Sequence, residues 1–351
     1  MLSQIKWAEL FPNKSSIVIF AAYVGFFTNQ GILVRWTQSA DNSYPYNTVT
    51  AVLLTDFIKL IITSALFCRD HPVKALLTEV IRNSRVCSLY LIPAFLYSLY
   101  NNIAFLSLSA FDPTTYYLLL QLRVALTGVV YQVIFKKRLS GTQWMSLLLL
   151  TVGCMIKEMD FSNLSNLFGG LEGKKWSFLL LLFQMSCSCL AGVYNEYLLK
   201  KESPSANIFI QNVFMYLNSI VCNMVMVMLH EPLSQTFSSE SLSAVLVPSV
   251  IILMLNNAGG GITTSFFLRN LNSIMKTFTG AIELTCSAIL CYILFGIPIY
   301  LNTVISIVTV SYATILYSSN PVSKEEDNVK EKYDVEMLHP LMDRESKVTV
   351  V

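Results

Sequence analysis

Long apolar runs follow one another from residue 16 to residue 318, with almost no polar face between them. A helix needs about 20 mostly apolar residues to cross a bilayer. Ten stretches come close to that length, near 16–35, 48–68, 87–110, 114–135, 141–157, 176–199, 206–229, 243–268, 273–295 and 298–318. Only 13% of the residues are charged, where about 25% is usual. This composition excludes a soluble enzyme, a nucleic-acid-binding protein and a disordered scaffold, and it predicts an all-α integral membrane protein.

The positions of Lys and Arg predict how the chain crosses the membrane, because cytosolic loops carry an excess of these residues. If the N-terminus is cytosolic, twelve of them fall on the cytosolic side and two to four on the other side. Both termini are therefore predicted to be cytosolic, with residues 1–15 before the first span and a charged, disordered tail over 319–351. The loop 158–175 then lies on the luminal side, where the sequon at Asn163 is a candidate for glycosylation.

Ten spans divide into two sets of five, and an odd-numbered repeat places its second copy upside down in the membrane. The predicted halves are residues 16–157 and 176–318. Each half has a pair of adjacent asparagines, Asn101-Asn102 and Asn256-Asn257, with one cation in a span about 20 residues later. Paired asparagines also serve as hydrogen-bonding contacts between spans. The pattern predicts two inverted five-helix repeats, an arrangement typical of transporters with a substrate site near the midplane.

Several ionisable side chains are predicted inside spans, where a charge is costly and marks a functional site by default. They are Asp56, Lys59, Arg123, Glu196, Lys276 and Glu283. Asp56 and Lys59 are three positions apart and share a helix face, so they can pair. The pair suits a binding site, or equally a tether within the bundle. Glu196 lies near the end of its span and is expected at the membrane interface.

Arg123 and Lys276 have no acidic residue within four positions along the chain, so each needs an anionic partner from elsewhere. One candidate partner is a protein carboxylate, such as Asp56 or Glu283. The other is a substrate that carries phosphate. Arg binds phosphate oxygens in a bidentate manner, and Lys supplies a mobile point charge. Two cations, one from each half, match a diphosphate held between the halves.

Neutral polar residues near these cations suit a base and a sugar, because aromatic rings stack on nucleobases and amides bond to base edges and hydroxyls. The candidates are Tyr97, Tyr100, Asn101, Asn102, Tyr116, Gln121, Asn212 and Tyr216. Some tyrosines are instead expected at the membrane interface. Gly259-Gly260-Gly261 follows no strand, so it indicates close helix packing or a bend. The sequence contains no catalytic or metal-ligand constellation, so neither an enzymatic activity nor a cofactor is assigned.

Five motifs carry a resemblance to a known family. In chain order they are Thr55–Leu60, Tyr97–Asn102, Ala191–Glu196, Gln211–Leu217 and Ser273–Lys276. Together they resemble the nucleotide-sugar transporter family of the Golgi and endoplasmic reticulum, part of the drug/metabolite transporter superfamily, over residues 16–318. The resemblance implies ten helices in two inverted halves. It also implies exchange of a cytosolic nucleotide sugar for a luminal nucleoside monophosphate.

The resemblance implies roles for individual residues as well. Lys276 would contact the phosphates. Asn101 and Asn102 would contact the nucleotide, and Tyr97 and Tyr116 its base or ribose. Asn212 and Tyr216 would line the sugar side.

Two positions depart from the pattern of the CMP-sialic acid carriers, which have Lys in place of Arg123 and Gln in place of Tyr100. Both departures favour a UDP-sugar. The expected function is therefore a UDP-sugar:UMP antiporter of the Golgi membrane rather than the endoplasmic reticulum, with UDP-galactose as the first candidate. The sequence leaves open UDP-N-acetylglucosamine and UDP-glucose, a scaffold for Golgi glycosyltransferases, a plasma-membrane exporter, and a homo-oligomer. It indicates no nucleic-acid partner.

Overall fold

The computed structural model of the chain describes residues 7–37, 44–111, 113–159, 175–202, 206–230, 237–296 and 299–322. Helices make up 87% of it, and no strand occurs within those ranges. The apolar runs form helices because a bilayer offers no partners for free backbone groups, which a helix satisfies internally. The glycosylation candidate Asn163, most of the loop 158–175 and the tail beyond residue 322 lie outside the described ranges.

The helices divide between the two halves of the sequence. The first half contains, in chain order, α1 (Trp7–Leu10), α2 (Lys14–Thr37), α3 (Thr48–Asp70), α4 (Val73–Arg82), α5 (Ser84–Leu89), α6 (Leu91–Ala110), α7 (Pro113–Leu120), α8 (Arg123–Phe135) and α9 (Gly141–Glu158). The second half contains α11 (Lys175–Tyr197), the π-helix η3 (Leu198–Glu202), α12 (Ile208–His230), α14 (Ser239–Val245), α15 (Pro248–Asn270), α16 (Ser273–Phe295) and α17 (Leu301–Ser319).

Eight of the ten predicted spans are confirmed as helical segments long and apolar enough to cross a membrane. They are α2, α3, α7 with α8, α11 with η3, α12, α15, α16 and α17. The two other predicted runs, 87–110 and 141–157, are helical as α6 and α9 but are not among the eight. The chain is thus an all-helical protein with eight candidate spans, and the ten-helix inverted repeat stays a prediction.

The eighth predicted run begins later than expected. Its predicted range is 243–268, but α14 ends at Val245 and α15 starts at Pro248. Proline favours the first turn of a helix because its fixed φ fits there and its missing N–H is not needed. The run therefore divides into the end of a short helix and a span that starts at the proline.

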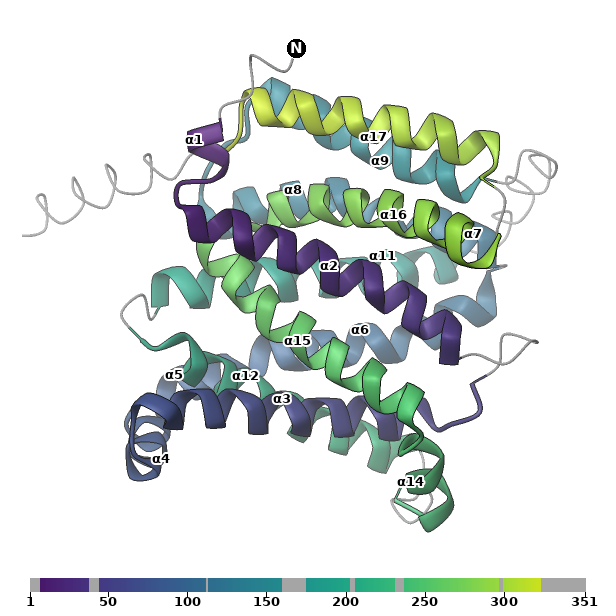
Figure 1. Cartoon of the computed structure of the whole chain (residues 1–351). Helices are drawn as coiled ribbons and strands as arrows, with labels where there is room; N and C mark the ends of the chain where they lie inside the picture. The colour runs from purple at the N-terminus through teal and green to yellow at the C-terminus, as the bar shows by residue number, and fades with distance from the viewer. Residues whose placement is uncertain are drawn as a thin grey trace, which may run out of the picture.

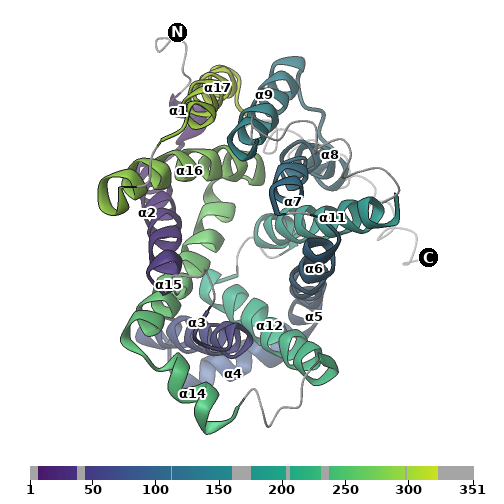
Figure 2. The same cartoon turned by 90° about the vertical axis from the view of Figure 1, so that its right-hand side faces the viewer.

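The long helices pack in pairs that join the two halves of the sequence. The closest pairs are α9 with α17, α6 with α11, α2 with α15, and α3 with α12. Figure 1 shows α9 beside α17 at the top, and Figure 2, turned by 90°, shows helices of both halves interleaved around the bundle. Each half therefore buries its apolar surface mainly against the other half, and neither forms a separate body.

The glycine triplet lies inside the continuous helix α15, where the prediction of close helix packing is confirmed. A Cβ at Gly259 would lie 2.5 Å from the ring of Phe26 on α2. Asn256, one turn earlier, donates a hydrogen bond of 2.9 Å to the Phe26 carbonyl. Small residues let two helices approach until their backbones nearly touch. The triplet therefore packs α2 against α15.

Candidate functional site

The fourth predicted span, 114–135, is broken into α7 and α8 immediately before Arg123. At the break, the N–H groups of Gln121 and Leu122 bond to carbonyls three residues back, at 3.2 and 3.0 Å. Arg123 is the first residue of α8, and its carbonyl accepts bonds from Thr127 at 2.8 Å and from the Cys189 thiol of α11 at 3.3 Å. The segment remains one helical span with a tightened 3₁₀-type turn, and such a turn within a helix often marks a functional position. The break fixes the backbone of Arg123 against α11.

The structure brings Arg123 and Lys276 together. They interact electrostatically with each other, and both interact with Glu283. Glu283 also interacts with Lys157, at the end of α9. Within the described ranges, the side chains of Arg123 and Lys276 make no ion pair or hydrogen bond. Arg123 is exposed and Lys276 is half-buried. Three cations therefore lie near the Glu283 carboxylate; the other carboxylate near Lys276, Glu196, is already paired with Lys200. The two predicted cations remain available to a ligand.

The predicted tyrosines Tyr97, Tyr100 and Tyr116 form a series that reaches Arg123 through Tyr116. Tyr116 interacts electrostatically with Tyr100 and Arg123, and Tyr100 with Tyr97. The Tyr116 hydroxyl accepts a hydrogen bond of 2.8 Å from Gln184 of α11. Tyr116 of α7 is thus within electrostatic reach of a cation, with the α6 tyrosines beyond it, an arrangement that suits a base or ribose site.

The predicted amide side chains differ in what they bond to. Asn102 donates to the Ser98 carbonyl one turn earlier, at 2.8 Å. Gln121 is buried and donates to the Tyr117 carbonyl at 3.3 Å. Asn101 is exposed, and its side chain has no hydrogen-bond partner among the residues that the structure describes. Asn101 is thus the amide of α6 most open to a ligand.

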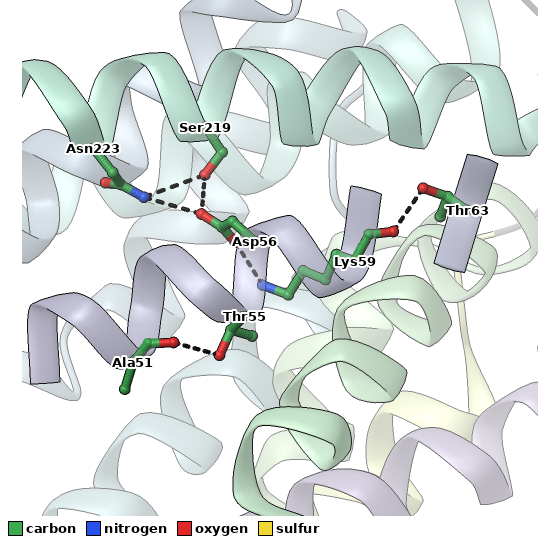
Figure 3. A network of polar contacts seen from close by, with 7 residues as sticks. All are labelled: Ala51, Thr55, Asp56, Lys59, Thr63, Ser219 and Asn223. Carbon is green, nitrogen blue, oxygen red and sulfur yellow. Dashed lines mark hydrogen bonds and ion pairs between the residues drawn. The ribbon is translucent and has the colours of Figure 1, made fainter. Parts of the chain in front are cut away.

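Asp56 and Lys59 form the predicted ion pair on α3, with 3.0 Å between the ammonium and the carboxylate. The other Asp56 oxygen accepts hydrogen bonds from two residues of α12, Ser219 at 2.7 Å and Asn223 at 3.0 Å (Figure 3). Asp56 is buried, with 5% of its surface exposed. Three donors therefore occupy this carboxylate and join the first half of the chain to the second. This contact pattern favours the tether over the binding site.

Lys59 also reaches the predicted sugar side. Its ammonium lies 5.6 Å from the centre of the Tyr216 ring, within the range of a cation–π contact. A Cβ at Gly261 would lie 3.0 Å from the Lys59 side chain, so glycine makes room for it against α15. Asn212, one turn before Tyr216, is buried, and its amide nitrogen has no partner among the described residues. These residues form a second polar cluster between α3, α12 and α15.

Glu196, which was expected at the membrane interface, lies one residue before the end of α11 and faces the protein interior. Its side chain is fully buried and accepts hydrogen bonds from Lys200 at 2.5 Å and from the Ser273 backbone N–H at 2.7 Å. Lys200 also donates to the Leu271 carbonyl. A buried carboxylate is tolerated when it is paired and hydrogen-bonded. The pair holds the start of α16, three residues before Lys276.

The predicted site residues did not include Tyr23, Ser219 and Asn223. Tyr23 on α2 interacts electrostatically with Glu283, Tyr97 and Arg123. Ser219 and Asn223 are four positions apart on α12, and such a polar pair on one face of an apolar span indicates a polar partner opposite. That signal was present in the sequence. Tyr23 had none, because it is one of 17 tyrosines in a largely apolar chain.

Known proteins resemble this chain in sequence and in fold. A family model described as nucleotide-sugar transporter matches residues 15–318. The chain is 49% identical to the UDP-galactose transporter senju of Drosophila melanogaster, over 90% of this chain and 89% of that protein. It is 27% identical to CMP-sialic acid transporter 2 of Oryza sativa subsp. indica, over 87% of this chain and 84% of that protein. One crystal structure aligns with a TM-score of 0.61 at 13% identity, over 89% of this chain and 99% of the other. That last likeness shows a shared fold alone.

Proposed function

Because the chain belongs to the nucleotide-sugar transporter family, we propose that it carries a UDP-sugar across the Golgi membrane in exchange for UMP. UDP-galactose is the first candidate, since it is the substrate in the name of the relative with 49% identity. The sugar nucleotide would supply glycosyltransferases in the lumen. The chain itself would perform no covalent chemistry.

The charge around Arg123 carries this proposal. Arg123, Lys276 and Lys157 lie within electrostatic reach of the Glu283 carboxylate, and Lys276 is also within reach of Glu196, which is paired with Lys200. Together these four cations and two carboxylates have a formal excess of two positive charges (four minus two). An uncompensated charge inside a membrane is costly. The diphosphate of a UDP-sugar carries two negative charges, and the monophosphate of UMP carries about −1.5 to −2 at neutral pH. Both members of the exchanged pair therefore neutralise the site.

The proposed contacts follow the two polar clusters. Arg123 and Lys276 bind the phosphates, with Arg123 in a bidentate manner. Tyr97, Tyr100 and Tyr116 stack on the base and ribose, and the amides of Asn101, Asn102 and Gln121 bond to the nucleotide. Asn212 and Tyr216 line the sugar side. Asp56 and Lys59 support the site as a tether between α3 and α12.

We further propose that α6 and α9 are the two remaining spans, which gives ten in two inverted repeats. The packing of α6 along α11 and of α9 along α17, both candidate spans, supports this. An even number of spans places both termini on one side, and the excess of Lys and Arg in the loops favours the cytosol. Because the halves interleave, the bodies that rock during alternating access contain helices from both.

The test is uptake of radiolabelled UDP-galactose into proteoliposomes that hold the purified protein and are preloaded with UMP. UMP inside the vesicles should accelerate uptake, and its absence should slow it. Lack of any acceleration would refute exchange. Competition by unlabelled UDP-N-acetylglucosamine and UDP-glucose ranks the other UDP-sugars, and CMP-sialic acid serves as the contrast. A scaffold for glycosyltransferases would show no uptake, and a plasma-membrane exporter would be reached by cell-surface labelling.

Lys276→Ala should impair this uptake through lost phosphate binding. A hydrogen bond to a charged group contributes about 1.5–3 kcal/mol, so apparent affinity should fall about 10- to 150-fold. Lys14→Ala is the matched control, because Lys14 is an exposed cation at the start of α2. Equal loss in both variants would show that Lys276 has no specific role.

A further inference from the structure

Helix α4, between α3 and α5, has an apolar stripe that no other described residue covers. Val73, Leu77 and Ile81 are exposed by 64%, 61% and 74%. They are four positions apart, so they line one face of the helix. Three large apolar side chains in a row on one exposed face require a partner that shields them from water.

The same helix is docked on the bundle by its neighbouring face. Leu76 and Val80 pack against the cluster that contains Phe67 of α3 and Phe214 of α12. At about 100° per residue, the apolar residues of α4 form a continuous arc, of which one side meets the bundle and the other side is exposed. The uncovered stripe therefore extends the apolar surface of the bundle outward.

The polar side of α4 and the turn after it are positively charged. Arg82 pairs with Glu79, and Arg69 with Asp70. Lys74 has no ion-pair partner among the described residues, and neither has Arg85. Residues 69–88 hold four cations and two carboxylates, so their net charge is +2. The partner that covers the stripe must therefore tolerate or attract positive charge beside it.

The position of α4 identifies that partner. Figure 1 shows α4 at one end of the bundle, next to α5 and the end of α3, and it contacts α3, α5 and α12. The ends of membrane spans mark the surface of the bilayer. At that depth, a helix with an apolar stripe and a basic flank matches the boundary between acyl chains and headgroups. Two copies joined through this face would bring their positive charges together.

We propose that α4 lies in the surface of the membrane leaflet at this end of the bundle, bound to anionic lipid. Val73, Leu77 and Ile81 enter the outer acyl region, and Lys74 and Arg85 contact anionic headgroups. The helix then anchors the connection between α3 and α6 to the membrane surface. This role is independent of what the protein transports and of which side of the membrane is cytosolic.

The experiment uses the full chain in nanodiscs, with the photoreactive residue benzoylphenylalanine in place of Leu77. Irradiation should give a phospholipid adduct, detected as a mass shift. The matched control has the same residue at Thr78, which is also exposed but lies on the polar side of α4; its adduct yield should be several-fold lower. Ile61, exposed by 66% within α3, is the positive control for lipid contact.

A second comparison tests the charge. Nanodiscs of phosphatidylcholine mixed with phosphatidylserine should give phosphatidylserine adducts at Leu77 above its share of the lipid. The double variant Lys74→Glu/Arg85→Glu should remove that enrichment while the adduct with total lipid persists. Adducts between two protein chains at Leu77, equal yields at Leu77 and Thr78, or no enrichment of phosphatidylserine would each overturn the proposal.

Discussion

Replacing Asp56 with alanine should destabilise the protein strongly, because this buried carboxylate holds three donors. The change leaves the Lys59 ammonium without its counter-ion and removes the acceptor of Ser219 and Asn223. Removing one partner of a buried ion pair costs about 3–5 kcal/mol. The Lys59 side chain is 19% exposed, so its ammonium can turn partly toward solvent after the change. We therefore expect the lower end of that range, about 3 kcal/mol.

Thermal unfolding of the detergent-solubilised protein measures this loss. A thiol-reactive dye reports it, because Cys154, Cys187 and Cys189 are buried and free in the folded state. A change of 1 kcal/mol shifts the midpoint by about 2–4 °C in chains of 150–250 residues. For this longer chain the low end applies, so Asp56→Ala should lower the midpoint by roughly 6 °C.

Two further variants test the reasoning. Ser219→Ala removes one neutral donor and should cost only about 1 kcal/mol. Lys59→Met removes the cation, so the double variant with Asp56→Ala should lose less than the sum of the two single variants. The reasoning is refuted if Asp56→Ala is no more destabilising than Ser219→Ala, or if the two losses simply add. Because Asp56 is assigned to a tether and not to the binding site, the Asp56→Ala protein that remains folded should bind UMP with nearly unchanged affinity.

Three other variants have defined outcomes. Gly259→Ala would place a methyl group 2.5 Å from the Phe26 ring and should cost about 1–3 kcal/mol of stability through overpacking. The control is Gly25→Ala, whose added methyl group would have nothing within 4 Å. Equal thermal unfolding midpoints for the two variants would contradict this packing. Glu196→Gln should lower both the unfolding midpoint and the affinity for UMP, because the Glu196 carboxylate holds the start of α16. Unchanged affinity would show that Glu196 does not support the binding site. Arg123→Lys keeps the charge but loses one of the two parallel hydrogen bonds to phosphate, which contributes about 1.5 kcal/mol. UMP should therefore bind roughly tenfold more weakly, as measured by equilibrium dialysis. Equal binding would exclude bidentate contact by Arg123.

Local patterns in the sequence were sufficient for several features of the site. The spacing of Asp56 and Lys59 predicts their ion pair, because residues three apart on a helix face each other. The absence of nearby carboxylates predicts that Arg123 and Lys276 lack local partners. Their mutual proximity was expected only through the repeat, since 153 residues separate them (276 minus 123), and the structure places them within electrostatic reach.

Other features could not be predicted from local patterns. The break before Arg123 occurs in a run of leucines without Gly or Pro, so no residue there signals the end of a helix. Glu196 resembled an interface residue by its place near the end of a span. Its burial depends on the start of α16, which lies 77 residues further along the chain.

The sequence by itself determined that this chain is a helical membrane protein and which residues break its apolar pattern. Hydrophobicity and charge act residue by residue, and a bilayer accepts only helices or closed barrels. The tertiary structure alone decided which helices are neighbours, and therefore that the two halves interleave, that Asp56 meets α12, and that Glu283 lies among three cations. Nearly all faces of these helices are apolar, so hydrophobicity does not specify the pairing. Close packing at small residues and polar contacts across helices specify it, and both depend on residues far apart in the chain.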